Sequence, residues 1–388
     1  MVAPTSFFKD YGGHIRILEE ATSLQNLGHS IAIVTYHMGD NMPGLTIRRT
    51  WPLPYRADYE VGSSRHKVTF DIYLWLKTIQ VGLQFQPDLV HGHMHEGALI
   101  GGFIAKLLRV PLVFDFQGSL TSEMVDHGFL AQNGVAYSFV RKIEKLACRI
   151  PDAILTSSLH AKDLLIEEFD VDGDSIYPMP DCVDTVRFDP ERVSDAEKMA
   201  LKQNLGIPLG LPVVVYLGLL ADYQGIPEII KAAAALNGAG SETFFLVMGF
   251  PKSDHYQELA NHLGVADRVL FTGKVQYRDA PRYLSLGDVA VSAKMSDTEG
   301  SGKVLNYMAM SIPVVAFDTT VHREYLAEHG VYAAVADYSA LAKGIKALTQ
   351  DSERAQSLGN ELRLRAKKMY SWEEAGKKIS SLYNLLTR

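Results

Sequence analysis

The chain has 388 residues, 47% of them hydrophobic and 21% charged, with a formal net charge of −7. This length predicts two domains, and the negative charge argues against nucleic acid as the main partner, because a phosphate backbone is bound by a basic surface. No run approaches the ~20 apolar residues of a membrane-spanning helix, no secretory signal is recognisable, and two unclustered cysteines, Cys148 and Cys182, indicate a reducing compartment. The sequence therefore predicts a cytoplasmic protein, with peripheral contact at the inner membrane face left open.

The first half alternates short β-branched runs with amphipathic stretches, which is typical of parallel sheets covered by helices. Met1 and Val2 are expected to end a first strand whose start is truncated. Further strands are predicted at 31–35, 89–91, 112–116 and 153–156, and helices at 15–27, 98–108 and 141–149.

A second series of the same kind follows Pro208. Its predicted strands are 213–217, 244–248, 269–271, 289–292 and 314–316, and its predicted helices are 226–236, 254–263, 279–286, 302–311 and 339–350, with a tail helix at 372–386. The proline-containing stretch 178–190 separates the two series as a linker. We therefore expect two Rossmann-like α/β domains, 1–185 and 186–368, followed by the tail 369–388, with ligands in a cleft at the carboxyl ends of the strands.

Three weaker motifs accompany this pattern. Gly12 and Gly13 stand between a strand and a helix, where they predict either a phosphate-binding turn or a tight turn without a ligand. His91, His93 and His95 alternate at a strand end; with Glu96 or Asp115 they fit a metal site, although a polar strand end lining the cleft is the favoured interpretation. Asp170–Asp174 resembles a calcium loop, but the prolines before Asp181 favour a solvated turn.

The strongest motif runs from Ser296 to Met310, after the strand 289–292 and at the start of a helix. Glu299 can accept hydrogen bonds from sugar hydroxyls, the backbone N–H groups of 300–304 can hold phosphate oxygens, and Asn306 lies one turn further on. A P-loop is excluded, because its first glycine and its Ser or Thr are replaced by Asp297 and Val304.

In these motifs the sequence resembles glycosyltransferase family 4, whose members have the two-domain GT-B fold. The resemblance covers nearly the whole chain in order. It is carried by residues 11–13, 27–31, 87–93, 183–190, 216–218, 224–225, 271–275 and 299–313.

The resemblance implies a retaining glycosyltransferase without a metal or other cofactor, which takes a sugar from a UDP- or GDP-sugar to a hydroxyl of a saccharide, lipid-linked or small-molecule acceptor. The 1–185 domain would serve the acceptor, the 186–368 domain would hold the nucleotide sugar, and the tail would cross back to the first domain. Glu299, Lys303, His93 and Gln117 are the expected catalytic positions. The expected donor-binding positions are Gly12, Gly13, Gly218, Gln224, Gly273, Val275, Gly300, Ser301, Gly302, Val304 and Asn306.

The chain departs from the family pattern at the diphosphate. Leu219 and Gln224 stand where the family has Arg and Lys, so we expect Lys303 to substitute, with Arg323 and Lys294 as other candidates. In addition, Asn306 replaces the second Glu of the family's acidic pair, and Gln117-Gly118 stands where a histidine is frequent.

Two other functions stay open at this stage. The missing cationic pair motivates a non-catalytic nucleotide-sugar or glycan-binding protein, and the three histidines motivate a metal-dependent hydrolase that a chelator would inactivate. The aromatic and basic residues Trp51, Tyr55, Arg56, Tyr59 and Arg65–Lys67 are interpreted either as an acceptor or membrane-facing surface or as a mobile loop.

Overall fold

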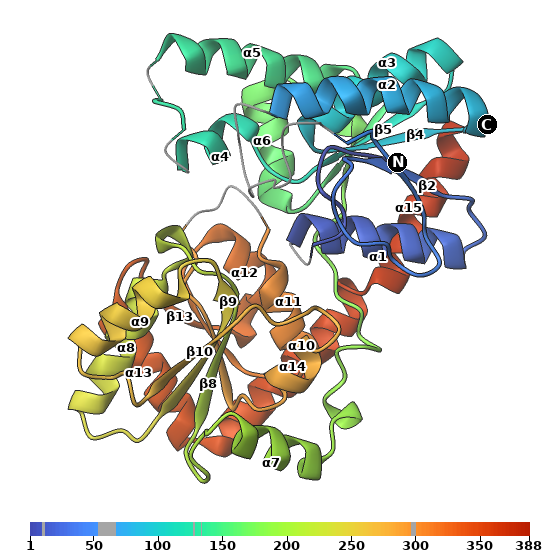
Figure 1. Cartoon of the computed structure of the whole chain (residues 1–388). Coiled ribbons are helices and arrows are strands. Elements are labelled where there is room, and N and C mark those ends of the chain that lie inside the picture. The colour runs from blue at the N-terminus through green and yellow to red at the C-terminus, as the bar shows by residue number, and fades with distance from the viewer. Residues whose placement is uncertain (10–11, 53–66, 127–128, 133, 296–299) are drawn as a thin grey trace. The chain divides into compact units, whose positions relative to one another are not determined.

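The computed structural model describes residues 1–9, 12–52, 67–126, 129–132, 134–295 and 300–388. The chain forms two compact units, each built around its own parallel sheet (Figure 1). Met1–Asp181 and Trp372–Arg388 belong to the first unit, and Cys182–Asp297 and Ser301–Ser371 to the second. The predicted α/β fold class is confirmed in both units.

The first unit has a seven-stranded sheet in the order β3-β2-β1-β4-β5-β6-β7, in which every strand pair is parallel. Its strands are β1 (Val2–Ala3), β2 (Ala32–Thr35), β3 (Thr46–Arg49), β4 (Val90–His93), β5 (Leu112–Phe116), β6 (Ala153–Thr156) and β7 (Ile176–Pro178). Its helices are α1 (Gly12–Asn26), α2 (Lys67–Phe85), α3 (Met94–Leu108), α4 (Leu120–Asp126), α5 (Val135–Arg149), α6 (Leu159–Phe169) and α15 (Trp372–Leu386).

The second unit has a six-stranded parallel sheet in the order β10-β9-β8-β11-β12-β13. Its strands are β8 (Val213–Leu219), β9 (Phe244–Phe250), β10 (Val269–Gly273), β11 (Val289–Ser292), β12 (Val314–Phe317) and β13 (Val331–Ala333). Its helices are α7 (Asp195–Asn204), α8 (Ile226–Gly238), α9 (Ser253–His262), α10 (Ala280–Leu284), α11 (Gly302–Ala309), α12 (Thr320–Leu326), α13 (Tyr338–Gln350) and α14 (Ser352–Met369).

The strand order reverses once in each sheet. In the first unit the chain leaves β1 toward β2 but leaves β4 toward β5, and in the second it leaves β8 toward β9 but β11 toward β12. Right-handed crossovers therefore place the helices after β1 and β4 on opposite faces, which opens a crevice at the carboxyl ends of these two strands. The same argument applies to β8 and β11, so each unit has one predicted place for a ligand.

All nine predicted internal strands are present, because each is a short run of mostly apolar residues, and most of these residues are buried. The sequence did not predict β3, β7 and β13, which are short strands outside the sheet centres. The Asp170–Asp174 segment is a turn, as favoured, in which the Asp172 carboxylate accepts from the Asp174 backbone N–H at 3.1 Å.

One glycine is required at the second crevice. Gly225 has φ +75° between β8 and α8, and a Cβ there would lie 2.2 Å from the backbone oxygen of Ala293, which follows β11. We expect Gly225→Ala to lower stability by about 1 kcal/mol or more, because both the backbone conformation and the space exclude a side chain. Thermal unfolding measures the effect.

Gly238 ends the same helix with nothing within 4 Å of its added Cβ, and it is the matched control. Gly238→Ala should leave the free energy of unfolding unchanged or raise it by about 0.5 kcal/mol. Equal effects of the two substitutions would contradict the close approach between the two loops.

Candidate functional site

The crevice of the second unit lies between the loop after β8 and the segment after β11. The two segments are joined by a backbone hydrogen bond from Met295 N–H to the Tyr223 carbonyl (3.0 Å). α11 begins at Gly302, a few residues after this contact. The motif predicted to bind the donor therefore opens a helix at the switch point of its sheet, as expected.

Lys303, in the first turn of α11, extends across this crevice. Its Nζ donates to the Tyr216 hydroxyl at 3.2 Å and to the Gln224 side-chain oxygen, and it lies 4.7 Å from the centre of the Tyr216 ring. A Cβ on Gly218 would be 3.4 Å from this ammonium group. Lys303 thus joins Gly218 and Gln224, which the sequence predicted as donor-binding positions, and its charge stands beside the position where the family's cationic pair is missing.

Two of the groups that Lys303 contacts are neutral. Burial raises the pKa of the Tyr216 hydroxyl well above its usual value, so this group remains a phenol, and Gln224 is an amide.

The turn before α11 has a buried polar atom of its own. The Ser301 hydroxyl oxygen is buried and has no hydrogen-bond partner among the described residues. It lies beside the first N–H groups of α11, which a helix leaves without internal partners. Val304 is buried and Asn306 is half-buried one turn later, while the expected sugar contact Glu299 lies outside the described residues.

The remaining donor candidates differ in position. Gly273 ends β10, two strands from β8, with φ +71°, and Val275 follows it half-buried. Arg323 is held in a bidentate ion pair by Asp318 (2.6 and 2.7 Å), and Lys294 is buried directly after β11. The sequence analysis gave Lys303, Arg323 and Lys294 as substitutes for the missing cationic pair. The described contacts of Lys303 lie at the predicted donor-binding positions Gly218 and Gln224.

In the first unit, Gln117 follows β5 and faces the start of α1. Its Nε2 donates to Asp115 Oδ2 at 2.8 Å, and its carbonyl oxygen would lie 2.9 Å from a Cβ on Gly13. Only a glycine at position 13 leaves this approach open. Gly12, exposed, begins α1 beside it. The predicted Gly12-Gly13 turn and Gln117 therefore belong to one site.

Asp115 is fixed by a buried guanidinium that the sequence analysis missed. Arg16 Nε lies 3.0 and 2.9 Å from the two Asp115 carboxylate oxygens, and its Nη2 donates to Oδ1 at 2.7 Å. Arg16 also donates to the Met179 carbonyl and to Asp181. Burial alone would raise the pKa of the Asp115 carboxyl, but Arg16 and a hydrogen bond from His93 hold it well below the usual range.

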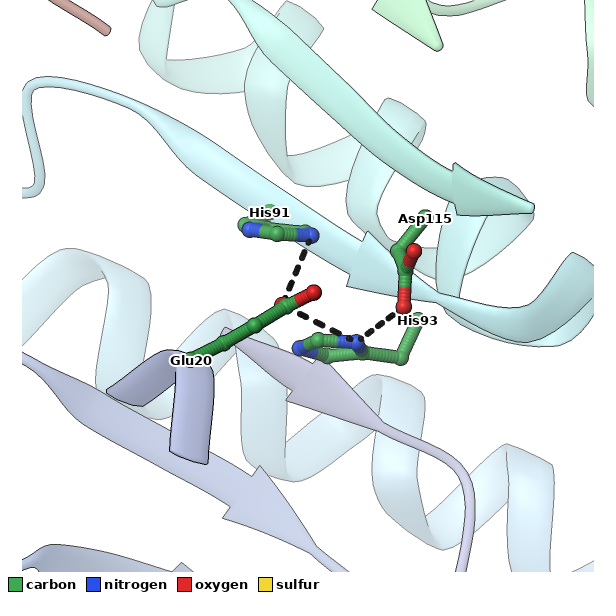
Figure 2. A group of neighbouring side chains, drawn as sticks. All are labelled: Glu20, His91, His93 and Asp115. Atoms are coloured by element: carbon green, nitrogen blue, oxygen red, sulfur yellow. Dashed lines mark hydrogen bonds and ion pairs between the residues drawn. The ribbon is translucent and has the colours of Figure 1, made fainter. Parts of the chain in front are cut away.

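Glu20, His91, His93 and Asp115 form a buried cluster with one ligand atom from each within 4.8 Å of the others (Figure 2). His93 Nδ1 lies 3.1 Å from Asp115 Oδ2, and the two imidazoles are stacked at 4.4 Å. Glu20 Oε2 lies 3.8 Å from His91 and 4.0 Å from His93. His91 Nδ1 bonds the Tyr383 hydroxyl of α15 at 2.5 Å.

This cluster has the ligand types of a metal site, yet its cation position is already filled. Arg16 lies 3.2 Å from Glu20 and bidentate on Asp115, and Asp115 Oδ2 also faces donors on His93 and Gln117. A metal ion would have to displace the guanidinium from a fully buried carboxylate. The arrangement fits the Arg16 cation better than a metal ion.

His93 was predicted as a catalytic position, but its side chain has no exposed surface. Burial lowers the pKa of His93, although Asp115 opposes this, and burial with its neighbour also lowers the pKa of His91. The His93 side chain lies behind Asp115 and Gln117, and its catalytic role stays a prediction. His95 turns away from the other two toward Glu144, at 3.5 Å. Residues 53–66, with Tyr55, Arg56, Tyr59 and Arg65, lie outside the described residues.

Comparison with known proteins supports the family and the fold. The family model "Glycosyltransferase Family 4" matches residues 12–187, and "Glycosyl transferases group 1" matches residues 197–365. The chain is 28% identical to the D-inositol 3-phosphate glycosyltransferase of Xylanimonas cellulosilytica, over 78% of this chain and 72% of the relative. It is 24% identical to the 2-deoxystreptamine N-acetyl-D-glucosaminyltransferase of Streptomyces fradiae, over 81% of this chain and 76% of that relative. The structure of Anabaena HepE with UDP and glucose has a TM-score of 0.79 at 16% identity, covering 99% of this chain and 98% of that one, and is similar in fold.

The buried Glu20 carboxyl gives a testable pH dependence. Burial and the nearby Asp115 raise its pKa well above the usual value, although Arg16 opposes this, and its oxygens have no hydrogen-bond partner among the described residues. Above about pH 4.3 the unfolded chain releases this proton while the folded chain keeps it, so the wild type loses stability as pH rises toward the folded-state pKa. The Glu20→Gln variant cannot ionise at this position, so its stability relative to the wild type should increase as pH rises.

Urea unfolding at about pH 5 and about pH 8 measures this difference. Glu167→Gln, on the exposed side of α6, is the matched control and should change stability equally at both pH values. A glutamine variant whose gain does not increase with pH would show that Glu20 is ionised in the folded protein.

Proposed function

The chain belongs to glycosyltransferase family 4, and on that premise we propose that it transfers a sugar from a UDP- or GDP-sugar to a hydroxyl group, with retention of anomeric configuration and without a metal ion. The contact of Lys303 with Gly218 and Gln224 carries this proposal. A leaving nucleoside diphosphate develops negative charge, and a fixed cation beside it lowers the barrier.

The donor would bind at the crevice of the second unit. Its diphosphate would meet the Lys303 ammonium and backbone N–H groups at the start of α11, where the Ser301 hydroxyl, which has no partner among the described residues, supplies a further donor. The related fold of HepE, solved with UDP and glucose, supports a uridine nucleotide as the first donor to test. Glu299 stays the predicted contact of the transferred sugar.

Gln117 would contact the acceptor. Because its Nε2 is committed to Asp115, the carbonyl oxygen is the end that can accept a hydrogen bond from a substrate hydroxyl. The names of both curated relatives specify a polyhydroxylated ring, an inositol phosphate or a deoxystreptamine. We therefore propose an acceptor of this class, free or linked to a lipid.

The chemistry needs no protein nucleophile. The bond from the anomeric carbon to the diphosphate oxygen breaks, the acceptor oxygen bonds to the same face of that carbon, and the leaving diphosphate takes the acceptor proton. Asp115 is unsuited to attack the sugar, because its two oxygens are held by Arg16 and it is fully buried. The protein contributes position and charge.

We predict that Lys303→Ala lowers kcat for sugar transfer roughly 10²–10³-fold, because one preorganised charge donor at the leaving group is lost. Because Lys303 Nζ also contacts the buried Tyr216, the thermal midpoint of the variant is measured beside its activity, and we expect the folded structure to persist. Steady-state transfer kinetics measure the loss, and Lys303→Arg, which keeps the charge, should retain part of the activity.

Lys343→Ala provides the matched control, since this exposed lysine lies on α13 and outside the crevice. It should transfer at the wild-type rate. Unchanged turnover in Lys303→Ala would remove this lysine from the diphosphate site and with it the main support for the proposed donor grip.

The donor and the absence of a metal requirement are tested together by thermal unfolding in EDTA with UDP, GDP and ADP. A ligand at about 100 times its Kd stabilises the folded state by about 2.7 kcal/mol, so we expect a clear rise of the midpoint with UDP or GDP. Activity in EDTA should equal that without chelator. A shift or a turnover that appears only after a divalent metal is restored would overturn metal independence.

A further inference from the structure

The helices α2, α3 and α5 lie side by side over one face of the first sheet (Figure 1). The surface that they turn away from the sheet, here called the α2–α3–α5 face, is unusually apolar. Its exposed large apolar side chains are Val68, Ile72, Leu76 and Leu83 on α2, Phe103 and Leu107 on α3, and Phe139, Leu146 and Ile150 on or directly after α5. Isolated exposed apolar residues are ordinary, but a group spread over three neighbouring helices marks an interaction surface.

These side chains are connected rather than scattered. Trp75 of α2 packs edge-on against Phe103 of α3 at 5.2 Å. Ile150, at the end of α5, lies so close to α3 that a Cβ on Gly102 would be 2.6 Å from it. The apolar surface therefore continues from α2 across α3 to α5.

The three helices of this face are rich in basic residues, although the whole chain has a net charge of −7. The three helices contain seven basic residues, Lys67, Lys77, Lys106, Arg141, Lys142, Lys145 and Arg149, against three acidic ones, Asp71, Glu96 and Glu144. The carboxylates are engaged or buried: Glu144 is fully buried, Glu96 pairs with Lys67, and Asp71 accepts from Tyr36 at 2.6 Å.

Several of these cations have no carboxylate partner. Within the part of the chain that the structure describes, Lys106, Arg109 and Lys142 are exposed and form no ion pair, and Lys145 and Arg149 share the single carboxylate of Asp170. Positive charge thus lies among exposed phenylalanine and leucine side chains. This combination is the one by which helices lie in the interface of an anionic membrane.

We propose that the α2–α3–α5 face docks the protein onto an anionic membrane surface. The apolar side chains would enter the interface, and the basic side chains would contact the lipid phosphates. A second copy of the chain fits this face poorly, because a symmetric contact would set the same unpaired cations against each other. The docking is peripheral, since none of the described helices is long and apolar enough to span a bilayer.

The test is co-sedimentation of the full chain with vesicles of phosphatidylcholine plus phosphatidylglycerol, compared with phosphatidylcholine alone, at low and high salt. We expect binding to the anionic vesicles and weaker binding at high salt. The double variant K106E/K142E should lower the vesicle partition coefficient roughly tenfold or more. The double variant F139S/L146S should lower it as well, at both salt concentrations.

Matched controls carry the same changes elsewhere: L364S on an exposed position of α14 and K343E on α13 should bind vesicles as the wild type does. All four variants should keep the wild-type thermal midpoint, since every changed side chain is exposed. No preference of the wild type for anionic vesicles would overturn the proposal. So would equal binding by the face variants and the controls, or a dimer in solution that the face variants abolish without any vesicle binding.

Vesicle binding is measured without nucleotide or acceptor. Its failure would therefore leave the proposed transfer reaction untouched, and a chain without transfer activity could still bind vesicles. If docking holds, the acceptors to test first are those whose hydroxyl is carried by a membrane lipid.

Discussion

A buried guanidinium organises the carboxyl edge of the first sheet. Arg16, from α1, holds both oxygens of Asp115 at the end of β5, and it also reaches Met179 and Asp181 after β7. The helix α1, the end of β5 and the segment after β7 are therefore fixed to one charge. Removing such a cation leaves buried carboxylates without compensation, at a cost of about 3–5 kcal/mol. The Arg16–Asp115 pair also orients Gln117, because the Gln117 amide donates to Asp115.

The two units use their cations differently. In the first unit, the charge of Arg16 is compensated inside the protein by the fully buried carboxylate of Asp115, one of the four side chains in Figure 2. In the second unit, the ammonium group of Lys303 is oriented by the Tyr216 hydroxyl and the Gln224 side-chain oxygen, beside Gly218. A cation at the start of a helix, where the backbone N–H groups carry partial positive charge, attracts an anion. We assign the leaving group to the second unit for this reason.

The sequence predicted most of the sheet strands and much of the site, for identifiable reasons. Apolar runs such as 213–216 are buried on both faces and have few alternative structures. The 299–306 motif is local, so Lys303 was found from its neighbours alone. Arg16 was missed because its partner Asp115 lies 99 residues away and no local pattern links them. The helix α14 was missed because it buries mostly small residues, Ala355, Gly359 and Ala366, along a polar surface.

The helix α2 was missed for a reason that bears on function. From Val68 to Leu76 its apolar residues alternate with polar and aromatic ones, so the pattern matches period two as well as the helical period. Phe70 and Leu74 face the sheet, whereas Val68, Ile72 and Leu76 face outward. A helix that only covers a sheet has no use for apolar residues on its outer side, and water opposes them. The same outward apolar residues thus make the sequence pattern ambiguous and make the face apolar. A membrane surface that shields them on docking would explain why they are there.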